Sequence, residues 1–189
     1  MRHLAPASLV PLLGLWLALG CSDGTSPTDT VRPLFKAGGR SGFGFNGRAS
    51  GFPIGEVRLT GGGSFDPATA SNTVPTETSV VSGGGFDCTA AVAQGPLAGC
   101  AAGQGVRWDT AQLLASTGFK CTGSDALKSA VTDEYTAVLL AHFYRAGDGD
   151  NESFTAQIIV ADGDLSPDPG VQNLWVQGVG CGTAIVNFN

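Results

Sequence analysis

Residues 135–161 read YTAVLLAHFYRAGDGDNESFTAQIIVA, and this stretch decides the fold class. Two apolar stretches with a period of two flank the Gly- and Asp-rich segment 146–151, a pattern typical of two strands joined by a turn. One face of the first strand would carry Tyr135, Ala137, Leu139, Ala141 and Phe143, and one face of the second Phe154, Ala156, Ile158 and Val160. The sequence therefore favours an antiparallel hairpin. The alternative is a helix over 132–147 that Thr132 would cap and Gly147 would end.

The region from about residue 52 onward has the same texture of short alternating stretches between Gly, Pro and Asp clusters. Further strands are predicted at 56–60, at 105–109 and within 174–188, and one short helical turn at 111–115. The glycine runs at 61–63 and 83–85 lack the GxxxxGK[ST] signature of a phosphate loop, so we interpret them as bulges or sharp bends. The predicted fold class is mostly β: a small antiparallel barrel or sandwich, stapled by disulfides, with at most one or two short helices.

The N-terminus has the features of an export signal. Arg2 precedes an apolar run over residues 4–19 that contains no acid or base and is interrupted by two prolines. This run is too short for a comfortable membrane span, and the polar segment 22–27 follows it. At its end, the residues LALGC at positions 17–21 resemble a lipobox, the cleavage motif of bacterial lipoproteins.

The resemblance implies that Cys21 receives a diacylglyceryl group on its sulfur and becomes the first residue after cleavage, with fatty acids such as palmitate on its new amine. Several acyl chains anchor a protein stably where a single chain does not. Ser22 resembles the sorting signal of lipoproteins sent to an outer membrane; in a host with one membrane the protein would stay at the cell surface. The alternative is an ordinary secreted protein cut near Ala18 or Gly20, with Cys21 as a spare thiol.

The expected organisation has three parts: a signal peptide at 1–20, a lipidated flexible tether at 21–50 and a single β-rich domain at 51–189. The tether is predicted because residues 22–49 are mostly small, polar or charged and would bury too little apolar surface to offset their ordering entropy. Within it, the segment 38–47, rich in Gly and Phe, is a candidate edge strand.

Four cysteines remain besides Cys21: Cys88, Cys100, Cys121 and Cys181. An even number in an exported chain predicts two disulfides, and the absence of a CxxC pair makes a zinc site the weaker interpretation. Three connectivities are open. We favour Cys88 with Cys100, which closes a short loop, and Cys121 with Cys181, which ties the last strand to the middle of the chain.

The charge balance excludes some partners. The chain has 10 basic and 16 acidic residues; cleavage removes Arg2 and leaves 9 basic residues against 16 acidic ones. This acidic balance argues against a nucleic-acid partner. It also means that attachment to a membrane would depend on the lipid, because no basic amphipathic patch is present to hold anionic head groups.

The single histidine of the mature chain, His142, stands between two apolar residues. A catalytic triad would need a nucleophile and an orienting acid beside it, and the chain contains no GxSxG motif. One imidazole also argues against a catalytic zinc centre built on several histidines. We therefore interpret His142 as a structural residue, and the protein as a binding module rather than an enzyme.

Carboxylates offer the main alternative chemistry. Asp148, Asp150 and Glu152 alternate in a Gly-containing turn, and Asp162 and Asp164 follow one strand later. Such oxygen ligands suit calcium, the one candidate cofactor, but the first run is not a full EF-hand loop and its residues are common in turns. A hydrolase with paired carboxylates, acting outside the cytoplasm, would draw on the same residues.

Aromatic residues suggest a third kind of site. Trp108, Tyr135 and Trp175 are candidates to line the mouth of a barrel that takes an apolar or sugar ligand, although such residues are more often part of the core. The function predicted from the whole sequence is that of a lipid-anchored, exported envelope protein that serves as a non-catalytic binding or structural module. The competing function is that of a calcium-stabilised domain or a carboxylate hydrolase.

Overall fold

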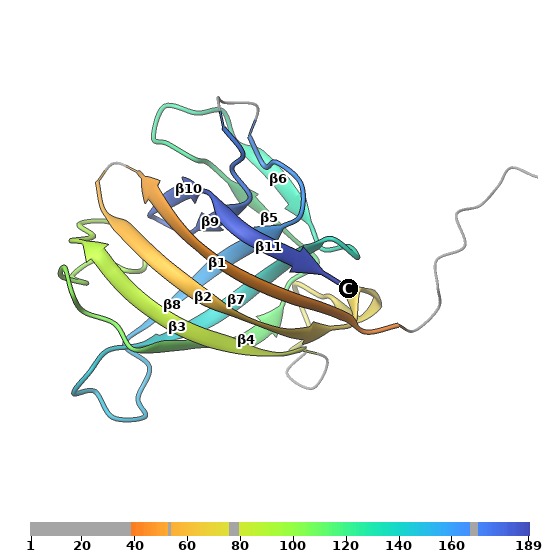
Figure 1. Ribbon diagram of the computed structural model, residues 1–189, viewed down its shortest axis with the longest axis horizontal. Coiled ribbons are helices and arrows are strands. Elements are labelled where there is room, and N and C mark those ends of the chain that lie inside the picture. The colour runs from red at the N-terminus through yellow and green to blue at the C-terminus, as the bar shows by residue number, and fades with distance from the viewer. Residues whose placement is uncertain (1–38, 53, 76–79, 167–169) are drawn as a thin grey trace, which may run out of the picture. The chain divides into compact units, whose positions relative to one another are not determined.

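The computed structural model describes residues 39–52, 54–75, 80–166 and 170–189 (Figure 1). Cys21, the predicted signal peptide and most of the predicted tether lie outside these residues. Within them the chain forms eleven strands: β1 (Ser41–Gly51), β2 (Glu56–Phe65), β3 (Val80–Ala90), β4 (Arg107–Leu113), β5 (Ser116–Phe119), β6 (Lys128–Val131), β7 (Thr136–Tyr144), β8 (Phe154–Ala161), β9 (Leu174–Val176), β10 (Gly180–Gly182) and β11 (Ala184–Phe188). The one helical element in this part of the chain is a 3-10 turn, η1 (Pro67–Thr69).

Nine of these strands form one antiparallel sheet, in the order β10-β9-β8-β7-β4-β3-β2-β1-β11. β1 also pairs with β10, through Ser50 with Cys181 and Gly51 with Gly180, and this pairing closes the sheet into a ring (Figure 1). β5 and β6 form a separate two-stranded sheet. The prediction of a mostly β, antiparallel fold is confirmed, and the closed ring is the barrel form of it.

The hairpin interpretation of residues 135–161 is confirmed. β7 and β8 pair antiparallel from Thr136 with Ala161 to Phe143 with Phe154. The short helical turn predicted at 111–115 is wrong, because β4 continues to Leu113, which pairs with Leu139 in β7. A register shift between Thr110 and Gln112 interrupts the alternation of inward and outward side chains there. The sequence therefore lacks the period-two pattern that would indicate a strand.

The domain begins earlier than predicted. Residues 41–50, assigned to the tether, belong to β1, which pairs with β2 on one side and with β11 on the other. It is therefore an interior strand rather than an edge strand. Phe43 and Phe45 explain the error: both are buried in the core, and two aromatic rings supply the apolar surface that the composition of the segment as a whole does not suggest.

Two apolar clusters hold the fold together. The larger one fills the interior of the ring, and the strands contribute alternate residues to it, such as Leu139 and Phe143 of β7. The smaller one lies on the outside, where Phe119 and Ala130 of the β5–β6 sheet pack on Val138, Ile159 and other residues of the ring. β7 and β8 are thus covered on both faces, which accounts for the unbroken apolar runs at 138–140 and 158–160.

Both predicted disulfides are present and have the favoured connectivity. Cys88 is bonded to Cys100, and Cys121 to Cys181. The second bond lies where the ring closes, because Cys181 is also the residue that pairs with Ser50 of β1. Backbones approach closely there: a Cβ on Gly180, whose φ is +123°, would lie 2.5 Å from the Ser50 carbonyl oxygen. Glycine is therefore required at position 180.

Two disulfides indicate that the domain folds in an oxidising compartment outside the cytoplasm. In the residues that the structure describes, no helix is long and apolar enough to cross a lipid bilayer.

Candidate functional site on the outer face of the sheet

The three aromatic residues predicted to form a ligand site lie in three different places. Trp108 is 1% exposed in the ring interior, where its indole N–H donates to the Thr60 carbonyl oxygen over 3.0 Å. Trp175 belongs to the outer apolar cluster and donates to the Lys120 carbonyl oxygen. Tyr135 is 59% exposed beside the short turn before β7. The predicted aromatic mouth is therefore wrong: Trp108 and Trp175 face opposite sides of the closed sheet, and Tyr135 lies outside the strands.

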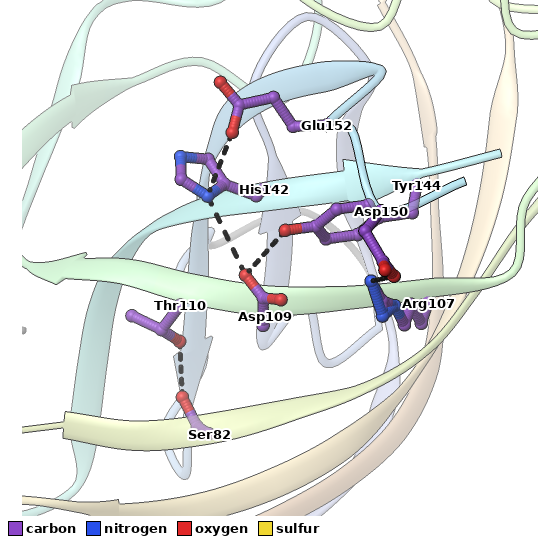
Figure 2. A network of polar contacts seen from close by, with 8 residues as sticks. All are labelled: Ser82, Arg107, Asp109, Thr110, His142, Tyr144, Asp150 and Glu152. Carbon is purple, nitrogen blue, oxygen red and sulfur yellow. Dashed lines mark hydrogen bonds and ion pairs between the residues drawn. The ribbon is translucent and has the colours of Figure 1, made fainter. Parts of the chain in front are cut away.

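Polar side chains gather instead on the outer face of β4 and β7. Asp109 of β4 is the register partner of His142 in β7, and Arg107 is the partner of Tyr144. Since Trp108 and Phe143 point into the core, these four neighbours point outward. The loop between β7 and β8 adds Asp150 beside Arg107 and Glu152 beside His142 (Figure 2).

His142 lies between two carboxylates that come from different elements. Its Nδ1 atom is 3.4 Å from Glu152 Oε2, in the loop, and 3.8 Å from Asp109 Oδ1, in β4 (Figure 2). The side chains of His142, Asp109 and Glu152 are 29%, 47% and 54% exposed, so water reaches all three. The arrangement links the loop to the sheet through one imidazole, which is charged only when protonated.

Tyr144 and Arg107 form the second half of the cluster. The Arg107 guanidinium lies 4.1 Å from the centre of the Tyr144 ring and 3.2 Å from Asp150 Oδ1. The Tyr144 hydroxyl donates to Asp109 Oδ1 over 3.4 Å. Burial, and then the Asp109 carboxylate, raise the pKa of the Tyr144 phenol above its usual 10.0, so this hydroxyl stays protonated and acts as a donor.

The first three predicted calcium ligands, Asp148, Asp150 and Glu152, interact instead with basic side chains and a hydroxyl group of the protein. Asp148 accepts hydrogen bonds from Ser153 Oγ and from Arg145 Nε. The Ser153 hydroxyl bond, followed by the Arg145 guanidinium, holds the pKa of Asp148 below its usual 3.8. Asp150 faces Arg107 and Glu152 faces His142, so successive carboxylates of the loop point to different partners.

The other two predicted calcium ligands, Asp164 and Asp162, also bond to groups of the protein. Asp164 Oδ1 accepts the backbone N–H groups of Ser166 and Gln172, and these bonds lower the pKa of its carboxyl. Asp162 contributes its backbone N–H to the Tyr135 carbonyl oxygen. Among the described residues, no three His, Cys, Asp or Glu side chains are arranged to hold a metal ion. The five predicted ligands therefore do not form the predicted calcium site.

The contacts of His142 do not resemble those of a catalytic triad. Both of its recorded ionic partners are carboxylates, whereas a triad needs a hydroxyl or thiol beside the imidazole. The two hydroxyls nearby in the same view, Ser82 and Thr110, bond to each other between β3 and β4 (Figure 2). This geometry suits the binding of polar groups and ordering of the loop.

A shallow hollow of about 300 Å³ adjoins the cluster. Gly85, which lines it, is the register partner of Arg107, so the hollow is one strand away from the Arg107–Asp150 pair. Its polar wall carries Arg58 and Asp87, whose charged groups are 4.0 Å apart. Small-molecule sites begin at about this size. The full lining consists of Arg58, Thr60, Gly85, Phe86, Asp87, Gly105 and Val106.

Sequence reasoning missed Asp109, Arg107 and Tyr144 as members of one site. The alternation of residues 105–109 indicated a strand but not its neighbour. β4 pairs with β7 although β5 and β6 lie between them in the sequence. No local sequence pattern predicts that pairing.

No protein-family model, curated protein or solved structure was found to match this chain.

Proposed function

We propose that this chain is an exported lipoprotein, acylated at Cys21, that presents its closed sheet at a membrane surface as a non-catalytic binding module. The lipobox-like residues 17–21 support the anchor, and the two disulfides agree with an exported destination. The outer membrane is the proposed location in a host that has one, and the cell surface otherwise. The acidic charge balance argues against nucleic acid as the ligand.

The observation that carries the binding function is the contrast between the two faces of the ring. The interior positions carry apolar and aromatic side chains, from Phe45 of β1 to Val176 of β9, that pack into one cluster. The outer face of β2 to β4 and β7 carries exposed polar groups and the hollow beside Arg107. A ligand would therefore bind on the outside of the sheet.

The same outer face argues for binding rather than catalysis. A general acid that works at neutral pH usually has a carboxyl pKa raised by burial. The carboxyls whose pKa is clearly shifted are those of Asp148 in the β7–β8 loop and of Asp125 and Asp164 in two other loops, and all three are lowered because hydrogen bonds favour the ionised form. Such groups hold charge and position loops, and they are poor proton donors.

The anchor is tested with Cys21→Ser, expressed through the native export route. Acylation needs the thiol, so we expect the wild-type protein in the detergent phase with the intact mass of an acylated chain. The variant should accumulate as uncleaved precursor or appear in the aqueous phase. Aqueous partitioning of the wild type, at the mass of an unmodified chain, would refute the lipoprotein assignment.

The binding assignment is tested by assaying the full chain for turnover on a panel of glycosides and esters. We expect none. Turnover that Asp109→Asn or Glu152→Gln abolishes, while the far-ultraviolet circular dichroism stays that of the wild type, would instead establish a carboxylate hydrolase on this face.

A further inference from the structure

Three acid–base pairs order the loop between β7 and β8; two of them join the loop to strands of the ring, and the third lies within the loop. Asp148 pairs with Arg145 and Asp150 with Arg107, and both guanidinium groups are charged at every physiological pH. Glu152 pairs with His142, whose imidazole gains and loses its charge with pH. Between about pH 5.5 and pH 8, one of the three pairs is therefore sensitive to protons, and the two arginine pairs are not.

The sensitive attachment has a second carboxylate on its other side. His142 Nδ1 lies 3.4 Å from Glu152 Oε2 and 3.8 Å from Asp109 Oδ1, so one ring atom faces both groups (Figure 2). A neutral imidazole can donate at most one hydrogen bond from this nitrogen. A protonated one carries a charge that attracts both carboxylates at once.

We infer that protonation of His142 bridges Glu152 to Asp109 and so draws the β7–β8 loop, residues 145–153, onto the outer face of β4. Loss of the proton removes the charge between two anions and leaves the loop joined to the ring by the Asp150–Arg107 pair. The loop is thus a pH-dependent cover beside the proposed binding face, and it closes as the pH falls.

The other described groups around His142 bring no positive charge that would oppose its protonation and the closure of the loop at lower pH. On its own row of the sheet, the neighbour in β8 is Thr155, which is uncharged, and beyond Asp109 the row continues to Gly83 in β3. The Tyr144 hydroxyl donates to Asp109 Oδ1 without bringing a charge.

The nearby cations are engaged elsewhere. Arg107 of β4 is paired with Asp150, and Arg145 at the start of the loop is paired with Asp148. Among the described residues, both ionic contacts of His142 are with carboxylates. A proton on the imidazole therefore strengthens its attraction to both of them.

The experiment measures hydrogen exchange in the loop of the full chain between about pH 5.5 and pH 8. The Asn151 amide donates to the Asp148 carbonyl oxygen inside the loop, so its exchange reports how well the loop is ordered, and a loop fixed to the sheet should be better ordered. Each rate is divided by that of an unstructured peptide at the same pH, which gives a protection factor. For a pair this exposed we expect protection about two- to fivefold higher at the acidic end.

Two variants separate the bridge from a general loosening of the loop. His142→Gln keeps a polar side chain without a titrating charge, and its protection factor should be independent of pH. Asp150→Asn removes an arginine pair instead, so protection should fall at every pH while the wild-type dependence on pH persists. Equal protection across the pH range in the wild type, or an unchanged pH dependence in His142→Gln, would overturn the bridge.

Glu152→Gln provides a further check that the loop partner matters. It removes the loop carboxylate and leaves Asp109 in place, so the pH dependence of Asn151 exchange should be lost as in His142→Gln. If Glu152→Gln keeps the full wild-type pH dependence, the bridge to the loop is refuted.

Discussion

The indole of Trp108 lies against Gly61 inside the ring, so closely that a Cβ on Gly61 would stand 2.8 Å from Trp108 Cζ2. Gly61 pairs with Phe45 in β1 and with Gly84 in β3, and Gly84 pairs in turn with Trp108. The rings of Phe45 and Trp108 are 5.8 Å apart. Gly61 of β2 and Gly84 of β3 thus leave the volume that the two aromatic rings fill, which explains why each of the two glycine runs has a member at this position.

Gly61→Ala should therefore destabilise the fold. The new Cβ would also lie 2.5 Å from the Gly83 carbonyl oxygen, and backbone cannot move aside cheaply. We expect a loss of about 1–3 kcal/mol in the free energy of unfolding, the usual cost of overpacking, measured by urea denaturation. Gly163→Ala is the matched control, because a Cβ there meets no atom within 4 Å. Equal losses in the two variants would contradict the packing argument.

The parts of the fold that were predictable from the sequence have local signals. The β7–β8 hairpin is predictable because apolar residues alternate in both strands and a Gly- and Asp-rich turn separates them. The two strands pair as expected. The two disulfides followed from an even number of cysteines and loop lengths.

What escaped prediction depends on partners distant in the sequence. β1 was assigned to a tether because its composition is that of a linker, and only pairing with β2 and β11 shows what Phe43 and Phe45 pack against. The outer-face site needs β4 beside β7, and a single sequence contains no information on that pairing. The sequence of the acidic turn is compatible with calcium ligands, and it does not show that Arg107 and Arg145 pair with Asp150 and Asp148.

The two disulfides should contribute unequally to stability. Removing Cys121–Cys181 opens a loop with a sequence separation of 60, against 12 for Cys88–Cys100. The chain-entropy relation then gives about 4 kcal/mol for the first bond and about 3 kcal/mol for the second. Each pair is replaced by alanines, and urea denaturation measures the free energy of unfolding. A larger loss from the Cys88 and Cys100 pair would show that local packing, rather than loop closure, sets the order.

Tyr144 should titrate above pH 10.0, because burial and the Asp109 carboxylate raise the pKa of its phenol. In the background of Tyr135→Phe, the ultraviolet absorbance of tyrosinate reports Tyr144 alone, since the chain has two tyrosines. Adding Asp109→Asn should lower that pKa towards 10.0. Because the pKa is raised in the folded state, the associated stability is complete below pH 10.0 and is lost as the pH rises through the folded value. An unchanged pKa in Asp109→Asn would refute the coupling.

Asp148 should give the fold a stability that disappears in acid. Hydrogen bonds from Ser153 and Arg145 hold the pKa of Asp148 below its usual 3.8 in the folded chain. The ionised carboxylate therefore stabilises the fold above about pH 4, and this contribution is lost as the pH falls through the lower, folded pKa. Thermal unfolding of Asp148→Asn should show a lower Tm than the wild type near pH 7, and the difference should shrink near pH 2.5.

The control for this prediction is Asp162→Asn, because the Asp162 carboxylate forms no hydrogen bond or ion pair with the residues that the structure describes. The Tm of this variant should follow the wild type at both pH values. The wild type itself should lose Tm between about pH 4 and pH 2.5, because Asp125 and Asp164 have pKa values lowered in the same direction. A difference between wild type and Asp148→Asn that is equal at both pH values would show that the side chain acts through packing. A shrinking difference would show that its charge, held by Ser153 and Arg145, closes the base of the loop.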